Sequence, residues 1–319
     1  MKTNLTKTKF KSVFSTVSQL FSRAACLGAV ILVCASASAQ NLFVSGSVPP
    51  KNCRGGCGVI YKFTWDGGQS IFASGLIDPW DVAFDSTGNL FVVGYDHDEL
   101  FGEAAVYKIT PSGVRTTFAS GLSYPSYVAA DRAGNLFVAD YDDGIIYKYK
   151  PTGSRAIFAS GLHHPVGMAF DSSGNLFVVD NSIGNMYQGS IYEYKPNGSR
   201  TTFAVLNPSD RPADLAFDSM GNLLMADVGG NIYKYDLVVL RRHPRTTFGS
   251  VPNSAQSLAC DSAGNLLVVD AGDVVGSGTA TPNAIYKFTQ QGVRSTFAPA
   301  QPLGETFACL AFQPIPCCQ

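Results

Sequence analysis

Apolar and polar residues alternate in short blocks along nearly the whole chain after about residue 40. Runs of four to six apolar or aromatic residues, such as VAFD, NLFVVD and IYKY, are bounded by Gly, Asp, Asn, Ser or Pro. The residues between these runs do not repeat apolar positions with the spacing of a helix. Runs of this length between turn-forming residues are typical of short antiparallel strands. The pattern therefore predicts an all-β protein.

The runs belong to one repeated unit. The phrase Asp-x-x-Gly-Asn-Leu occurs five times, at intervals of 46, 40, 47 and 43 residues. In each copy Asp can accept backbone hydrogen bonds at the start of a tight turn, and Gly supplies the positive φ that closes the hairpin. Four strands per unit at this period indicate the blade of a β-propeller. The turn aspartates are Asp85, Asp131, Asp171, Asp218 and Asp261.

The two ends of the repeated region complement each other. NLFVSG, VIYKF and QSIFAS, which begin at residue 41, match the second, third and fourth strands of a unit without its first strand. Residues 307–312, FACLAF, match a first strand with nothing after it. Pairing the two ends would close the ring and remove exposed strand edges. We therefore expect a six-bladed β-propeller of four-stranded antiparallel blades, closed by the C-terminal first strand joining the N-terminal strands.

The repeat PxxVAFDxxGNLFVADxxxxxIYKY resembles NHL-repeat propellers and the related gluconolactonase and regucalcin-like group, over nearly all of residues 41–313. The gluconolactonase-like members of that group hold a divalent cation in the channel with a glutamate, two asparagines and an aspartate. The positions that this resemblance aligns with those ligands carry neither a carboxylate nor an asparagine. They are Trp80, Ser126, Val166, Ala213, Gln256 and Ala308.

Residues 1–39 have the organisation of a secretory signal. Five basic residues precede the apolar stretch AACLGAVILVCA, and the small residues Ala37-Ser38-Ala39 follow it. This stretch is shorter than the roughly 20 residues that a membrane-spanning helix needs. We expect cleavage before Gln40, a single propeller domain over residues 40–319, a secreted or periplasmic location and no membrane span after signal removal. An uncleaved anchor is the alternative.

Charge and cysteine content narrow the possible partners. Without its signal the chain keeps 18 basic and 24 acidic residues, and a net charge near −6 disfavours a nucleic-acid partner. Six cysteines remain, and in an oxidising compartment they could pair in 15 ways. The close spacing in CRGGC makes Cys53 and Cys57 the predicted local disulfide.

The two faces of the predicted disc differ in variability. Turns between first and second strands repeat almost unchanged, whereas the loops between second and third strands and the links between blades vary in length and sequence. Length variation on one face favours that face as the binding surface. The last positions of the links should surround the mouth of the central channel. These positions are Asp81, Tyr127, Gly167, Asp214, Ser257 and Cys309.

Five residues on the variable face are the candidate ligand-binding set: Trp80, Asp81, Tyr127, His164 and Asp214. Asp81 and Asp214 should lie opposite each other across a six-fold ring, where two carboxylates could hold a divalent cation such as calcium. The simpler alternative is that both carboxylates bind backbone groups of neighbouring links. His163 and His164 replace Ile77-Asp78 and Ser123-Tyr124 of earlier links, so the repeat does not require histidine there.

Three functions remain compatible with these residues. The chain has no GxSxG or HExxH motif and no phosphate-binding glycine loop at the start of a helix. We favour a secreted, non-catalytic module that binds a small molecule, peptide or protein on the variable face. The alternative, implied by the resemblance, is a metal-dependent lactonase-like hydrolase. A lyase resembling the streptogramin-cleaving propellers is a third option, with His164 as the only well-placed base. Whether the chain is an enzyme stays open at this point.

Overall fold

The computed structural model describes residues 40–48, 57–65, 67–96, 103–181, 189–237, 245–272, 283–298 and 306–314. Ser38–Gln319 form one compact unit. All regular secondary structure in the described residues is β, which confirms the predicted class. None of the described residues forms a helix that is long and apolar enough to cross a membrane.

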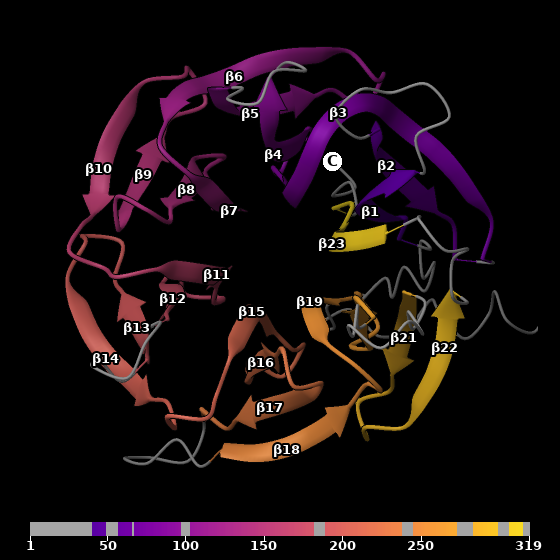
Figure 1. Ribbon diagram of the computed structural model, residues 1–319. Coiled ribbons are helices and arrows are strands. Elements are labelled where there is room, and N and C mark those ends of the chain that lie inside the picture. Colours follow the sequence, from indigo (N-terminus) through magenta and orange to yellow (C-terminus); the bar gives the residue numbers. More distant parts are fainter. Residues whose placement is uncertain are drawn as a thin grey trace, which may run out of the picture. The chain divides into compact units, whose positions relative to one another are not determined.

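Four sheets each contain four antiparallel strands in chain order, and each corresponds to one sequence repeat (Figure 1). The first is β7 (Pro125–Ala130), β8 (Leu136–Asp140), β9 (Ile145–Tyr149) and β10 (Arg155–Ala159). The second is β11 (Pro165–Phe170), β12 (Leu176–Asp180), β13 (Ser190–Tyr194) and β14 (Arg200–Val205). The third is β15 (Pro212–Phe217), β16 (Leu223–Asp227), β17 (Asn231–Tyr235) and β18 (Arg245–Ser250). The fourth is β19 (Ala255–Cys260), β20 (Leu266–Asp270), β21 (Ala284–Phe288) and β22 (Arg294–Ala298).

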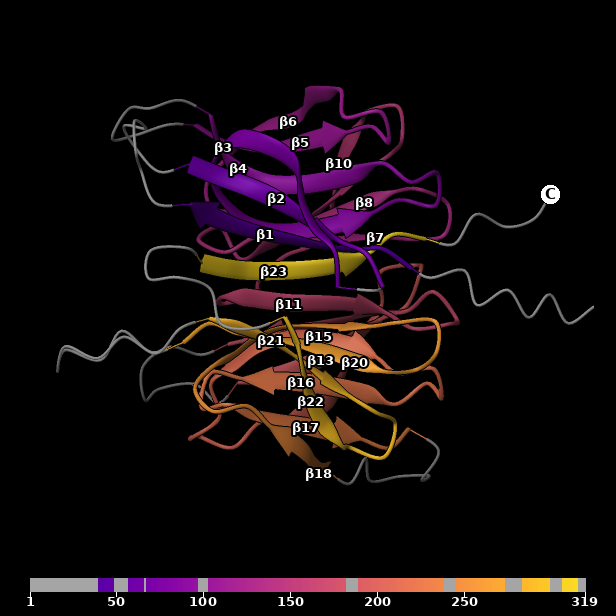
Figure 2. The ribbon, with the colours of Figure 1, turned by 90° about the vertical axis from the view of Figure 1, so that its right-hand side faces the viewer.

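The remaining strands form one seven-stranded sheet in the order β23-β1-β2-β3-β4-β5-β6. The terminal strand β23 pairs antiparallel with β1, so that Leu42 lies opposite Phe312, as the complementary ends predict. Figure 2 shows these two strands side by side. The bounds are β1 (Leu42–Val48), β2 (Cys57–Phe63), β3 (Gln69–Phe84), β4 (Leu90–Asp96), β5 (Glu103–Ile109), β6 (Arg115–Leu122) and β23 (Thr306–Phe312).

This sheet differs from the prediction of separate four-stranded blades at β3. Its first part, Gln69 to Leu76, pairs with β2, and its second part, from Ile77 onward, pairs with β4. The link that the sequence pattern places between two blades is therefore extended enough to continue the strand. Six strands still contact one another in succession around the centre of Figure 1. They are β3, β7, β11, β15, β19 and β23.

The repeated turn has the predicted mechanism. Asp131 Oδ1 accepts the backbone N–H of Asn135 at 2.8 Å, and Asp131 Oδ2 accepts the Asn135 side-chain amide at 2.7 Å. Gly134 has φ 77°, a backbone conformation that glycine adopts without strain. The same arrangement recurs at Asp85, Asp171, Asp218 and Asp261. These aspartates hold the turns.

The core lies between neighbouring sheets. Every residue of β8, β12, β16 and β20 is buried, which explains why second strands read as continuous apolar runs ending in Asp. Phe137 contacts the rings of Phe158 and Phe170 edge-on, with centroids 4.9 and 5.0 Å away. Phe177 makes the corresponding contacts in the next sheet. The recurring aromatic residues therefore pack the core and join one sheet to the next.

Candidate functional site

A buried hydrogen-bond network occupies the channel at the link end of the first strands. The Cys309 thiol donates to Asp81 Oδ1 at 2.8 Å and also lies 3.1 Å from Ser257 Oγ. Ser257 Oγ in turn donates to Asp214 Oδ2 at 2.9 Å. Strands β3, β23, β19 and β15 supply these four residues. The network thus connects the two aspartates that the repeat analysis singled out.

Both carboxylates also bind the backbone of the next first strand. Asp81 Oδ2 accepts the N–H of Val128 at 2.7 Å, and Asp214 Oδ2 accepts the N–H of Leu258 at 2.9 Å. Asp214 Oδ1 accepts the N–H of Leu215 at 2.7 Å. These contacts are those of the simpler alternative, in which the carboxylates join neighbouring links. They give each aspartate a structural role, whatever else it does.

The other two predicted ring positions meet the same network. The Tyr127 hydroxyl donates to the carbonyl oxygen of Ala213 at 2.8 Å. Gly167 has φ 59°, and a Cβ atom there would lie 2.8 Å from the Cα of Asp214. Glycine is required at this position because a side chain would collide with the backbone of β15. The structure therefore brings all six predicted ring positions to one level of the channel.

Burial dominates the electrostatics of the network. Removal from water raises the pKa of Asp81 to about 6, although hydrogen bonds from Cys309 and Val128 oppose the rise. The pKa of Asp214 rises to about 7, first through burial and second through the charge of Asp81. Burial and the same two carboxylates raise the pKa of Cys309 well above its usual range. Cys309 is therefore a thiol, and it lacks the thiolate character of a nucleophile at neutral pH.

A cavity of about 480 Å³ opens next to this network. Cys309 and Tyr127 lie in its wall. The wall also contains five of the six positions that correspond, by the family resemblance, to metal ligands of gluconolactonases: Trp80, Ser126, Val166, Gln256 and Ala308. A chain of aromatic contacts runs along one side: Trp80 to Tyr124 at 6.4 Å, Tyr124 to Tyr141 at 5.8 Å, and Tyr141 to His164 at 4.5 Å between centroids. Trp80 is 47 % exposed, although it is apolar and large. An open aromatic side chain in a cavity wall offers a surface for a flat or cyclic ligand.

The predicted residues therefore occupy three different places. Trp80 and Tyr127 line the cavity. Asp81 and Asp214 touch Cys309 and Ser257 just behind the lining. His164 packs on Tyr141, a lining residue, and its backbone N–H donates to Asp180. His163 lies beside Asp180, with its Nδ1 atom 3.5 Å from the carboxylate.

Sequence reasoning did not select Tyr124, Tyr141 or the Cys309 thiol as site residues. Cys309 and Ser257 stood in the predicted ring, so their positions were available from the repeat. Tyr141 directly follows Asp140, which ends a second strand, and the repeat alone does not show that this side chain turns toward the channel. The aspartates that end second strands cap the links. Asp140, for example, accepts the N–H groups of Ser123 and Tyr124 at 2.8 and 2.9 Å.

The residues at the cavity wall do not suit the divalent cation that the resemblance implies. Among the six aligned positions, Ser126 and Gln256 carry the side-chain oxygens, and the Ser126 hydroxyl lies near the carbonyl oxygens of Ala139 and Pro165. Divalent cations such as calcium require several oxygen ligands, mainly carboxylates. Within the described ranges, no three His, Cys, Asp or Glu side chains are grouped as a metal site.

Of the cysteines, Cys260 and Cys309 are free thiols. Cys53, one partner of the predicted disulfide with Cys57, lies outside the described residues, so this disulfide stays a prediction.

The comparisons with known proteins agree on the fold. A gluconolactonase from Xanthomonas campestris is 16 % identical and superposes with a TM-score of 0.53 over 70 % of this chain and 85 % of its own. The virginiamycin B lyase of Staphylococcus aureus is 12 % identical, with a TM-score of 0.55 over 86 % of this chain and all of its own. A Bacteroides caccae protein of unknown function is 17 % identical, with a TM-score of 0.60 over 86 % and 99 %.

No protein-family model matches the chain, and no curated protein matches its sequence. At these identities the similarity establishes the fold alone. The fold is that of the gluconolactonase-like and virginiamycin B lyase propellers, in agreement with the resemblance drawn from the repeats.

Proposed function

We propose that the chain is a lactonase-like hydrolase that admits a small cyclic ester to the cavity beside Trp80 and Cys309. The observation that carries the proposal is the position of this cavity. Cys309 in its wall donates to the buried carboxylate of Asp81, and behind the lining the same network reaches Asp214, whose pKa is about 7. A carboxyl group with a pKa near neutrality exists in both protonation states at neutral pH, as general acid–base catalysis requires. The shared fold with a gluconolactonase is consistent with this chemistry.

The reaction needs one water molecule and a base. Water adds to the ester carbonyl carbon, and the carboxylate of Asp214 accepts a proton from that water. The ring C–O bond then breaks, the protonated Asp214 returns its proton to the departing alkoxide, and a hydroxy acid leaves. Because Asp214 lies behind the lining, the attacking water would stand in the channel between this carboxylate and the substrate. Tyr127, with its raised pKa, keeps its proton and stays a hydrogen-bond donor.

The aromatic side of the cavity positions the substrate in this proposal. Trp80 offers a half-exposed ring, and Tyr124 and Tyr141 extend this aromatic surface along the lining. The test is the initial rate of ring opening with a panel of γ- and δ-lactones, measured with a pH indicator. Trp80→Ala should raise KM about tenfold through the loss of an aromatic contact and its buried area. Trp65→Ala is the matched control, because Trp65 is 73 % exposed and outside the cavity lining.

Calcium at Asp81 and Asp214 remains a separate proposal. The cation would have to compete with the N–H donors of Val128 and Leu258 for the carboxylate oxygens. Metal analysis of the purified protein tests it. Stoichiometric calcium that disappears in Asp81→Asn and Asp214→Asn would support the site, and equal calcium in all three proteins would place the cation elsewhere.

A non-catalytic binding module in the same cavity is the second candidate. It is favoured by the wall positions, which carry few reactive groups, and by the hydrogen bonds that already occupy both aspartates. In Trp65→Phe the fluorescence of Trp80 alone would report ligand entry. Quenching by a lactone without any ring opening would identify a binding protein and would reject the hydrolase.

We also infer a count of six blades and an exported protein. The count follows if the two halves of β3 belong to two blades, one completed by β23, β1 and β2 and the other by β4, β5 and β6. Export rests on residues 1–39 of the sequence. Amino-terminal sequencing of protein recovered from outside the cytoplasm should begin at Gln40, and an intact Met1 terminus would contradict the signal.

A further inference from the structure

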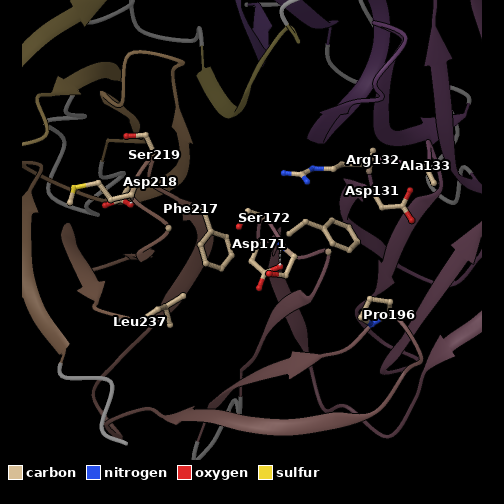
Figure 3. Close-up of a pocket in the computed structure, with 16 residues that line it drawn as sticks. Asp131, Arg132, Ala133, Asp171, Ser172, Pro196, Phe217, Asp218, Ser219 and Leu237 are labelled. Atoms are coloured by element: carbon tan, nitrogen blue, oxygen red, sulfur yellow. Dashed lines mark hydrogen bonds between the residues drawn. The ribbon is translucent and has the colours of Figure 1, made fainter. Parts of the chain in front are cut away.

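A second cavity, of about 840 Å³, lies on the opposite end of the first strands. Three consecutive Asp-x-x-Gly-Asn turns form it: the turns joining β7 to β8, β11 to β12 and β15 to β16. Pro196 and Leu237 complete the lining. This is the face that the sequence repeats almost unchanged, where no binding residue was predicted. Figure 3 shows the side chains that line the cavity.

Two departures from the repeat meet in this cavity. The residue after the turn aspartate is serine in four turns, Ser86, Ser172, Ser219 and Ser262, and is arginine only at Arg132. The next residue is Thr, Ala or Ser in four turns and methionine only at Met220. The turn itself uses the aspartate, glycine and asparagine, so neither departure serves the turn. Both side chains nevertheless line the same cavity.

Arg132 has a charge that is available to a ligand. The neighbouring carboxylates are already engaged: Asp131 lies 3.9 Å from Lys148, and Asp218 lies 3.0 Å from Lys234. Asp171 accepts three hydrogen bonds from its own turn. Arg132 is exposed and makes no hydrogen bond, ion pair or ring contact with a described residue. In Figure 3 its side chain extends into the space between its own turn and the turns of Asp171 and Asp218.

Part of the lining is apolar. Met220 is 72 % exposed, which is unusual for a large apolar side chain, and Phe217 beside it is only partly buried. Phe170, Pro196 and Leu237 extend this surface. A flexible thioether side chain adapts well to apolar ligands of different shape. The cavity therefore combines one unpaired guanidinium with an apolar wall.

We propose that this cavity binds small organic carboxylates that carry an apolar body. The guanidinium of Arg132 would hold the carboxylate through two parallel hydrogen bonds, and Met220 and Phe217 would cover the apolar part. The hydroxyls of Ser172 and Ser219 provide further donors at the rim. This site is independent of the proposed hydrolase site, because its lining shares no residue with the cavity beside Trp80.

The test is NMR titration of the purified protein with 3-phenylpropionate, and with 3-phenylpropanol as its uncharged counterpart. The acid should shift the amide signals of Gly174 and Gly221 and the Nε–Hε signal of Arg132. Arg132→Ser restores the residue of the other turns and should weaken binding of the acid about tenfold or more, through loss of a charge-assisted hydrogen bond. Met220→Ala should weaken binding of both compounds.

Lys150→Ser is the matched control, because it removes one exposed positive charge from the same face outside the cavity lining. Its affinity for the acid should stay close to that of the wild type. The proposal is overturned if the wild type does not bind the acid, if acid and alcohol bind equally, or if Arg132→Ser binds the acid as the wild type does. Lactone opening in Arg132→Ser should be unchanged, so failure of this site and failure of the hydrolase are distinguishable.

Discussion

Replacing Asp81 by asparagine should make the protein less sensitive to rising pH. In the folded protein burial raises the pKa of this carboxyl from its ordinary 3.8 to about 6. The Asp81 carboxyl therefore stays protonated to a higher pH in the folded state than in the unfolded state. The resulting stabilisation is fully present below about pH 4 and is lost as the pH rises through about 6. The asparagine side chain would be neutral in both states and would not contribute to this loss.

The size of the effect follows from the two pKa values. Each pKa unit corresponds to about 1.4 kcal/mol, so the contribution of Asp81 falls by about 2 to 3 kcal/mol between pH 4 and pH 7.5. The free energy of unfolding of Asp81→Asn, minus that of the wild type, should rise by at least this amount over the same interval, because the substitution also removes the charge that raises the pKa of Asp214. The substitution also alters the hydrogen bond to Cys309, but that part of the free-energy difference is the same at every pH and does not change how the difference varies with pH.

The assay is urea denaturation at several pH values, followed by tryptophan fluorescence. Asp85→Asn is the control. Burial raises the pKa of Asp85, but hydrogen bonds from Asn89 and Thr87 outweigh burial, and the net pKa lies below 3.8. That group contributes stability above pH 4 and loses it in acid, so its variant should differ from the wild type by a constant amount between pH 5 and 8. A constant difference for Asp81→Asn over the same range would refute the raised pKa.

Three further predictions concern the scaffold. Asp140→Ala should lower the free energy of unfolding by about 2 to 3 kcal/mol, measured by urea denaturation, because the N–H groups of Ser123 and Tyr124 lose their acceptor. An unchanged free energy would show that Asp140 does not stabilise the link. Gly144→Ala should lower the free energy of unfolding by more than about 3 kcal/mol, since its Cβ would lie 2.1 Å from the Leu162 carbonyl oxygen. Gly153→Ala is its control, because Gly153 also has a positive φ but has open space around it, and should lower the free energy by about 1 kcal/mol. Equal melting temperatures of the two variants would contradict the collision. Deleting residues 306–319 should destabilise the entire unit because β1 loses its partner, and an unchanged thermal melt would contradict the ring closure.

The repeat was sufficient to predict the strands, the turns and the ring of channel positions. The turns could be predicted because their contacts are local: at Asp131, for example, the hydrogen bonds join residues only four positions apart in the sequence. The continuous strand β3 was not predicted, since the Gly, Asp and Pro of its link are ordinary turn residues. At Asp78 the backbone accommodates the link with φ 40°, and the strand continues on either side.

The chemistry of the channel was only partly predictable. The sequence placed Asp81 and Cys309 at equivalent positions, but their hydrogen bond joins residues 228 apart, and its donor depends on side-chain orientation. The cavity on the turn face was missed for a different reason. The residues that build its turns are the same in every repeat. The two residues that differ, Arg132 and Met220, belong to separate repeats, and only folding brings them into one cavity.

The pH dependence of lactone opening by the wild type and by Asp214→Asn tests the proposed hydrolase most directly. If Asp214 accepts the proton of the attacking water, kcat/KM of the wild type should rise with pH through about 7 and then level off, as this carboxyl ionises. Asp214→Asn should lose both the rise and most of the activity while it retains the folded ring. An Asp214→Asn rate profile equal to that of the wild type, or a wild-type protein that opens no lactone, would contradict the account.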